Sequence, residues 1–238
     1  MRKLAALAAG TVLVLLSAAP VEASLITFTT RATFDAAAPG LPTETFEDGN
    51  VSTGGIACAA PADSSTNNTC FSPGDILPGV QVVADGPFSL TSEALHYSTG
   101  IFSTTAALFA NFFDDTLALQ FGAGVNAVGF DAFAAKDPAP LSVSVFGASG
   151  LLGTFALSAP PNIAGTFFGV ISTDELITRI TLASLDFELG PAEGVDNVSF
   201  GTADVAAPVP EPATLLLVGT GLMGAGVRRW RQKRRRTC

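Results

Sequence analysis

Residues 127–146, AVGFDAFAAKDPAPLSVSVF, decide the fold class of this chain. In the first half, Val128 and Phe130 fall on one face of an extended backbone. In the second half, Ser142 and Ser144 alternate with aliphatic residues. A period of two is typical of a β-strand with one buried face. Turn-forming residues separate the halves, so the stretch predicts two consecutive strands.

The same alternation, punctuated by Gly, Pro, Asn and Asp, recurs along the chain between its two ends. One short helix is expected at 33–38, and loops with short strands are expected at 93–111. Almost no other segment has a helical period, so a parallel sheet would lack its crossover helices. An all-β, jelly-roll-like antiparallel β-sandwich is predicted. The predicted strands are 25–30, 43–47, 79–84, 88–91, 117–121, 127–134, 141–146, 152–157, 166–171, 177–185 and 195–200.

Residues 1–23 have the three parts of a secretory signal peptide. A basic start, Arg2-Lys3, precedes an apolar run, and small residues follow. Cleavage is predicted after Ala23, because Val21 and Ala23 offer the small side chains that signal peptidase needs. The chain is therefore expected to pass through the translocon and to lose this segment.

The C-terminus combines a proline-bounded acidic tripeptide, a short apolar segment and a basic end. Pro210, Glu211 and Pro212 come first, and an apolar run at 213–227 follows. This run is slightly shorter than the roughly 20 residues that span a bilayer, but flanking arginines can snorkel and let it cross. A basic segment resists translocation, so it should stay cytoplasmic while the body lies outside. Its positive residues, within 228–236, are Arg228, Arg229, Arg231, Lys233, Arg234, Arg235 and Arg236.

This order of elements resembles the PEP-CTERM sorting signal of Gram-negative bacteria. The resemblance is carried by Pro210, Glu211 and Pro212, by the apolar run and by the arginine cluster; Cys238 after the cluster departs from the pattern. It implies recognition by exosortase, a membrane-embedded cysteine peptidase that cuts near the tripeptide. The protein would then be exported, transiently membrane-anchored, and delivered to the cell envelope or outside the cell. An uncleaved tail anchor is the alternative.

The chain is thus divided into the signal peptide 1–23, one domain at 24–205 and the sorting segment 206–238. The domain alone has enough residues for a sizeable core. This body holds three basic residues against 19 acidic ones, all 21 of the chain except Glu22 and Glu211, so its net charge is −16. Such a body repels phosphate backbones and anionic lipid, which excludes nucleic acid as the expected partner. It suits cations instead.

Cys58 and Cys70 lie in a polar, turn-rich stretch. An oxidising compartment favours joining them, and the closed loop would contribute roughly 3 kcal/mol in the chain-entropy treatment. Two free thiols are the alternative. A zinc site is not expected, because the chain has one histidine and no third cysteine nearby.

No catalytic residue is predicted. His96, the only histidine, stands beside Tyr97 in a polar stretch without the residues of a nucleophile, metal or phosphate motif, and is interpreted as a surface residue. Asp114-Asp115 and Asp174-Glu175 offer the two carboxylates that glycosidases use. Both pairs fall where turns are expected, so solvated charges are the favoured interpretation.

Acidic residues near the two ends of the body suggest a calcium site. The first and last strands of a sandwich commonly pair, which would bring Glu47 and Asp48 to one edge with Asp196 and Glu193. Calcium takes six to eight oxygen ligands and tolerates irregular geometry. Turn-forming acids facing solvent are the alternative; no other cofactor is expected.

Two functional classes remain open. The first is a noncatalytic envelope or extracellular-matrix protein sorted by an exosortase-type system, with polysaccharide as a candidate ligand. The second is a secreted glycan-active hydrolase. The second half also resembles the extracellular domains often attached to PEP-CTERM tails, through 128–131, 166–172, 177–182 and 194–200, which implies a jelly-roll sandwich like those of lectins. Sugar sites often use exposed Trp or Tyr, whereas this body has Tyr97 and no Trp.

Overall fold

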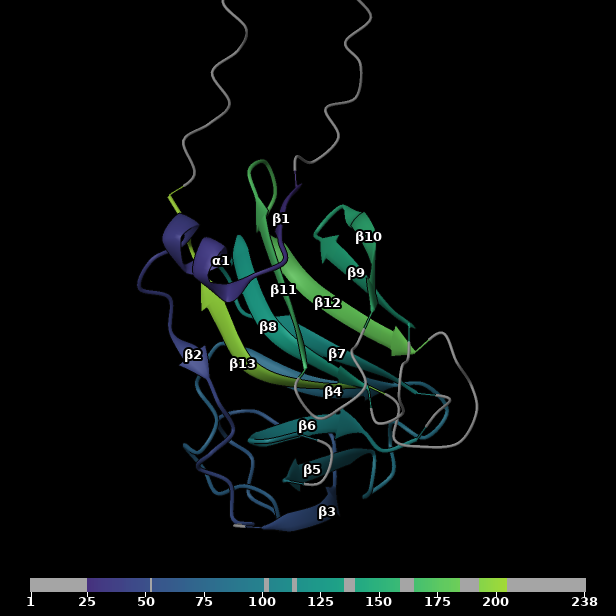
Figure 1. The fold of residues 1–238 in the computed structure, drawn as a ribbon. Coiled ribbons are helices and arrows are strands. Elements are labelled where there is room, and N and C mark those ends of the chain that lie inside the picture. Colours follow the sequence, from purple (N-terminus) through teal and green to yellow (C-terminus); the bar gives the residue numbers. More distant parts are fainter. Residues whose placement is uncertain are drawn as a thin grey trace, which may run out of the picture.

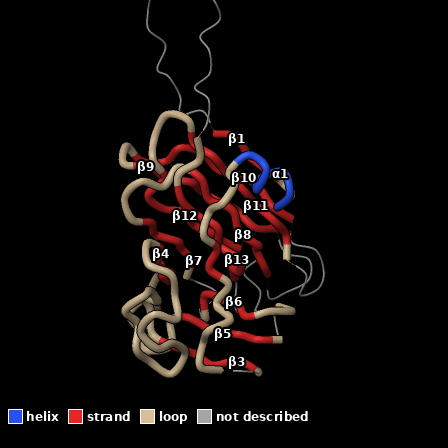
Figure 2. Tube along the Cα trace, turned by 90° about the vertical axis from the view of Figure 1, so that its left-hand side faces the viewer, coloured by secondary structure: helices blue, strands red, loops and turns tan. Residues whose placement is uncertain are grey.

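The computed structural model of the chain describes residues 25–51, 53–100, 103–112, 115–134, 140–158, 165–184 and 193–204. These residues form two antiparallel β-sheets that pack against each other, and one short helix (Figure 1). The predicted antiparallel sandwich is therefore confirmed. Figure 2, turned by 90°, shows how strands make up most of the described chain.

The larger sheet has eight strands and runs in the order β1-β11-β8-β13-β6-β5-β3, with β2 also paired to β13. Its centre is formed by β8 and β13, whose pairing shifts register between Asp196 and Ser199. The strands are β1 (Leu25–Phe28), β2 (Thr43–Glu44), β3 (Gly54–Cys58), β5 (Leu95–Thr99), β6 (Ala106–Ala110), β8 (Ala127–Ala134), β11 (Thr166–Ser172) and β13 (Glu193–Gly201).

The smaller sheet has five strands in the order β10-β9-β12-β7-β4. Its outermost strands are β10 and β4, and β12 lies at its centre, paired with both β9 and β7. The strands are β4 (Val80–Asp85), β7 (Thr116–Phe121), β9 (Pro140–Gly147), β10 (Gly150–Ser158) and β12 (Ile177–Ser184).

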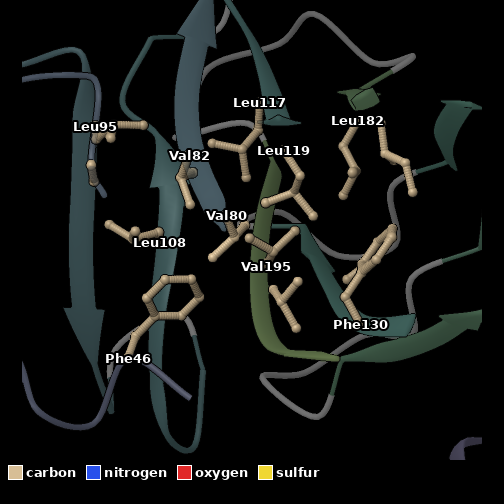
Figure 3. Packing of buried hydrophobic residues seen from close by; sticks show 14 of the residues in the cluster. Phe46, Val80, Val82, Leu95, Leu108, Leu117, Leu119, Phe130, Leu182 and Val195 are labelled. Atoms are coloured by element: carbon tan, nitrogen blue, oxygen red, sulfur yellow. The ribbon is translucent and has the colours of Figure 1, made fainter. Parts of the chain in front are cut away.

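The core lies between the two sheets and is filled by aliphatic and phenylalanine side chains. Val82, Leu119 and Leu182 from the smaller sheet meet Phe130 and Val195 from the larger one, and all five are fully buried (Figure 3). The predicted alternation is seen in β9, where every second residue points into this core. Apolar burial of this kind is the main term that holds the two sheets together.

The helix α1 (Arg31–Ala37) packs on the outer face of the larger sheet, over β11 and β1. It begins after Thr30, whose hydroxyl accepts a hydrogen bond from the backbone N–H of Thr33, as an N-cap does. Its Phe34 ring occupies the space that a side chain would need at Gly129 and Gly169. Glycine on β8 and β11 thus lets the helix pack close to the sheet, and the predicted helix is confirmed.

Some predicted elements are wrong. Residues 88–91 form turns and not a strand, and β3 falls in a stretch that was expected to be turns. The first strand does not pair with the last one: β1 pairs with β11, and it is β2 that pairs with β13. Local alternation cannot report which strands become neighbours, because pairing is a long-range choice.

The described chain begins and ends at the same end of the molecule (Figure 1). Leu25 pairs with Ser172, whose N–H donates to the carbonyl of Asn126 at 2.8 Å. The Asn126 side chain in turn accepts from the N–H of Ala203 at 2.7 Å and donates to its carbonyl at 3.1 Å. Both expected processing segments therefore connect to one pole of the sandwich.

Cys58 and Cys70 are joined by a disulfide, as predicted, with their Cα atoms 6.2 Å apart. Both residues are buried in the core, and Cys58 is the last residue of β3, the edge strand of the larger sheet. The bridge closes a segment whose ends are 12 residues apart and pins β3 to the loop that follows it.

Replacing both cysteines by serine is expected to lower the free energy of unfolding by about 3 kcal/mol, because the unfolded chain gains the loop freedom that the bridge removes. Urea denaturation of the exported protein measures the loss, and a reductant should bring the unchanged protein close to the variant. A variant as stable as the oxidised parent would contradict the structural role of the bridge.

Candidate functional site

A row of polar side chains crosses the outer face of the smaller sheet. Gln81 on β4 lies opposite Gln120 on β7, and Gln120 lies opposite Arg179 on β12. Each of the three is only half-buried, whereas their strand neighbours Val82, Leu119 and Ile180 point into the core. Because strand residues alternate between faces, pairing of three strands in register places these three polar residues side by side.

Arg179 extends across the sheet. Its guanidinium forms an ion pair with Asp85 of β4, so the side chain crosses the intervening strand β7. The Nε atom of Arg179 is buried and has no hydrogen-bond partner among the residues that the structure describes.

Asp63 fixes the other end of the row. Its carboxylate accepts from the amide of Gln81 at 2.8 Å and from the N–H and hydroxyl of Ser65 at 2.9 and 2.7 Å. Hydrogen bonds from the Ser65 hydroxyl and from Gln81 are the main reason that the pKa of Asp63 is lowered. The carboxylate is thus held ionised and oriented at the margin of the sheet.

Two adjoining hollows, of about 360 and 250 Å³, lie along this row. Gln81 and Gln120 line both, so the hollows form one groove, which we call the β4–β7–β12 groove. The larger hollow is lined by Asp63, Ser64, Ser65, Gly79, Val80, Gln81, Gln120, Phe121 and Gly122. The smaller is lined by Ala60, Pro61, Gln81, Val83, Ala84, Asp85, Ser89, Leu90, Gln120 and Arg179.

The groove mixes donors, acceptors and apolar contacts. Arg179 donates, Asp63 and Asp85 accept, and the two glutamine amides do both. Leu90, whose side chain is 98% exposed, gives an apolar contact at one wall. An open, shallow site of this composition suits a ligand that carries many hydroxyl groups around an apolar ring face.

Sequence reasoning did not find this groove. Its residues do stand at outward positions of strands that were predicted, at 79–84, 117–121 and 177–185. Nothing local indicated that these three strands are neighbours, and β4 and β12 are far apart in the chain. The usable signal was the rarity of Arg179 on a strand face in a body with so few cations.

Glu193, predicted as a calcium ligand, does not line the β4–β7–β12 groove. It is fully buried between the sheets, where its two oxygens accept from the backbone N–H groups of Leu117 at 3.0 Å and Ser184 at 3.1 Å. Burial raises the pKa of Glu193 to about 8; these two hydrogen bonds oppose the rise and repulsion from Asp115 adds to it. Its carboxyl group therefore links β13 to β7 and β12 across the core.

Asp196, also predicted as a ligand, belongs to a buried network. Burial raises its pKa to about 7, against the hydrogen bonds from the Thr105 hydroxyl and the Asn197 N–H. The Asn197 amide also joins it to Asp131, at 2.9 Å, and Asp131 pairs with Arg31 of α1 at 3.1 Å. The network fastens β13 to the helix on the outer face of the sheet.

Glu47 and Asp48, the remaining predicted ligands, are exposed, and Glu47 accepts from the N–H of Ala106 at 3.0 Å. Charges on Glu47, Asp196 and Asp48 all help raise the pKa of Tyr97 to about 12, after burial as the main cause. Within the described residues, no three His, Cys, Asp or Glu side chains gather as a metal-holding group. The calcium site stays a prediction.

The polar stretch that holds His96 and Tyr97 is more buried than its composition suggests. Tyr97 is fully buried, donates from its hydroxyl to the carbonyl of Phe46 at 2.9 Å and packs against Phe71. It therefore cannot serve as an exposed platform for sugar. His96 is half-buried on β5, where its ring covers Gly55 of β3 and burial lowers its pKa.

The two carboxylate pairs differ in burial. Asp115 is buried and accepts from the N–H of Phe88 at 2.9 Å, so it is not the solvated charge that was expected. Glu175 accepts from Ser149 in a turn, and this lowers its pKa, in agreement with a turn position. Glu44, for which the sequence predicted no role, is buried. Its carboxylate accepts hydrogen bonds from the N–H groups of Phe46 and Leu77, both at 2.6 Å.

The predicted processing sites lie outside the described residues. They comprise Ala23, the tripeptide Pro210-Glu211-Pro212, the apolar run at 213–227 and the basic segment at 228–236. Among the residues that the structure does describe, no helix has the length and apolar character to cross a membrane.

The fold and the groove define an acidic β-sandwich protein with a polar groove on one sheet. A family model described as "PEP-CTERM protein-sorting motif" matches residues 208–232. The chain therefore carries a PEP-CTERM sorting motif, as the sequence predicted, and this is consistent with an exosortase substrate. The motif implies export, with transient membrane anchoring before the envelope or the extracellular space is reached.

A comparison with curated proteins finds no match. Among solved structures, the enzymatically active domain of tailspike protein 4 from bacteriophage CBA120 is 12% identical and has a TM-score of 0.23. The likeness covers 66% of this chain and 20% of the tailspike chain. A likeness this slight carries no argument about activity.

Proposed function

We propose that this protein is a noncatalytic component of the cell envelope or extracellular matrix that binds polysaccharide in the β4–β7–β12 groove. The sorting motif accounts for its route out of the cell. The observation that carries the binding role is the row of Gln81, Gln120 and Arg179, aligned across three strands on the solvent side of the smaller sheet.

The row is matched to a sugar chain in its chemistry. Glutamine amides and a guanidinium present paired donors and acceptors that suit neighbouring hydroxyl groups. The ion pair between Arg179 and Asp85 and the bond between Gln81 and Asp63 hold these groups in place before a ligand arrives. A preorganised site loses less side-chain entropy on binding than a mobile one.

The charge of the body favours a neutral polysaccharide over an anionic one. The groove sets one arginine against two carboxylates, Asp63 and Asp85, within a body of net charge −16. Polyanions approaching this surface are repelled at low salt. Hydroxyl-rich neutral chains meet no such barrier.

A noncatalytic role is supported by where the unusual carboxyl groups lie. A glycosidase needs one carboxyl group with a raised pKa to act as the acid. Of the described carboxyl groups, Glu193 and Asp196 have raised pKa values, and both are buried away from the groove. Asp63, which lines the groove, has a lowered pKa.

Replacing Arg179 or Gln120 by alanine is expected to weaken glycan binding at least tenfold, because each removes a donor from the middle of the groove. The measurement is a glycan array of neutral and anionic oligosaccharides probed with the exported protein, with and without calcium, followed by calorimetry on the best binder. Arg179→Lys, which keeps the charge but loses the planar fork, should recover little of the affinity.

Glu175→Ala is the matched control, because it removes a half-buried charge in a turn outside the groove lining and should leave binding unchanged. Unaltered binding by the Arg179 and Gln120 variants would reject the groove as the site. Hydrolysis of a bound oligosaccharide would reject the noncatalytic role.

A further inference from the structure

The outermost strand β10 of the smaller sheet differs from the other edge strands. It is nine residues long, and within the described residues its one strand neighbour is β9. It contains no charged residue and no proline. A long, uncharged and unpaired edge offers backbone N–H and C=O groups to another strand, which natural proteins ordinarily prevent.

The three other edges are each protected. On β4, the backbone of Val82 exchanges hydrogen bonds with Ala62, at 2.8 and 2.9 Å, so a loop covers that edge. On β3, the strand is short and ends at the disulfide of Cys58. On β1, the part of the strand that the structure describes is four residues long. The edge of β10 has one protective feature among the described residues, a register shift near the start of the strand.

The distribution of charge singles out the same region. No Asp, Glu, Lys or Arg occurs between Asp137 and Asp174, although the body around this stretch has a net charge of −16. The stretch holds β9, β10 and β11. Leu151 at the start of β10 is 60% exposed. The net charge makes two copies of this protein repel each other, but β10 itself adds no charge to that repulsion. The carboxylate of Glu175 lies at the turn before the strand, on Ser149, and not along its edge.

We propose that β10 pairs antiparallel with β10 of a second copy of this chain. A strand that meets its own copy about a two-fold axis uses the same surface on both partners, so an uncharged edge is self-complementary. Pairing joins the two smaller sheets into one continuous sheet and satisfies the backbone groups along both edges.

The geometry also orients the two grooves. The two-fold axis of an antiparallel strand pair stands perpendicular to the sheet, so the outer faces of both smaller sheets point the same way. The two β4–β7–β12 grooves then lie on one side of the dimer. This consequence, unlike the pairing itself, rests on the proposed function, and it would let one polymer occupy both grooves with a gain in avidity.

The pairing is tested at Thr154, the exposed central residue of the nine in β10. All nine residues pair with the second copy only when this central residue lies at the two-fold axis, and Thr154 then lies beside Thr154 of that copy. Sedimentation of the exported protein without glycan should give the mass of a dimer. Thr154→Lys and Thr154→Glu should each give monomers, because like charges then face each other. Mixing these two variants should restore a dimer, because opposite charges now meet.

Thr27→Lys is the matched control, since Thr27 is an exposed residue on β1, an edge of the other sheet, and this change should leave the dimer intact. Melting curves of the variants show whether each is folded. A monomeric parent protein, a dimeric Thr154→Lys variant or a mixture that stays monomeric would each overturn the pairing. So would a parent that associates through β10 only with a different polypeptide. Glycan binding does not enter this test, so its outcome is independent of the proposed function.

Discussion

The free energy of unfolding is expected to fall as pH rises from about 4.5 to about 8, and Glu193→Gln should remove much of that fall. The pKa of Glu193 is 4.5 when unfolded and about 8 in the folded protein, mainly because of burial. Between these values the folded chain holds a proton that the unfolded chain has lost. Stability is therefore full below pH 4.5 and is lost as pH rises through 8, by up to about 1.4 kcal/mol per pH unit.

Glutamine keeps the size of Glu193 but does not titrate, so the difference between parent and variant isolates this one proton. Urea unfolding at several pH values gives the two slopes. Asp196, with a pKa raised to about 7, adds a similar contribution between 3.8 and 7, so Asp196→Asn on top of Glu193→Gln should flatten the curve further. Parallel curves for parent and Glu193→Gln would contradict the assignment.

The matched control is Glu175→Gln. Glu175 is half-buried and its pKa is lowered from 4.5, so it is ionised in both states above about pH 6 and its loss should leave the slope there unchanged. Glu193→Ala, unlike the control, should lower the free energy of unfolding. It leaves the N–H groups of Leu117 and Ser184 without their partner, at a cost of about 2–4 kcal/mol at pH 6.

Replacing Pro210, Glu211 and Pro212 together by alanine is expected to reduce the processed product at least tenfold and to leave the full tail on the chain. The tripeptide lies within the matched sorting motif, and the resemblance to this family implies that exosortase cuts near it. Mass spectrometry of the membrane fraction and of the medium distinguishes the tailed form from the processed form.

The fold should survive this change, because all described strands lie at or before Gly201 and their core uses no residue of the tripeptide. Pro208→Ala is the matched control, since it removes a neighbouring proline of the motif region but leaves the tripeptide intact. Exported protein that extends through Arg236, or equal processing of the parent and the triple-alanine chain, would contradict the cleavage.

Much of the secondary structure was predictable because alternation is local. Strands β7 to β13 fall where the period of two places them, and helix α1 overlaps the range expected for it, 33–38. Prediction failed where the pattern is weak. The strand β3, sequence GGIAC, has two glycines and a cysteine, and its pairing with β5 is a tertiary choice. The predicted strand at 88–91 forms turns instead.

Burial of polar residues could not be predicted for the same reason. Glu193, Asp196 and Tyr97 are polar by type, and for the two carboxylates the sequence alone suggested either solvent or a metal site. The structure buries all three because the backbone N–H groups of β7 and β12, the Thr105 hydroxyl and the Phe46 carbonyl pair with them. A buried polar group is tolerated when such partners exist, and those partners come from distant strands.

The sequence by itself determined the alternating strands, the cysteine pair, the acidic body and the two terminal segments, because each is written in the order and type of neighbouring residues. Only the tertiary structure decided that Gln81, Gln120 and Arg179 share one face, that Glu193 joins the two sheets, and that β10 is left at an open edge. The physical reason is that each strand could pair with many others. The packing of the whole core selects one arrangement, and no single segment does so.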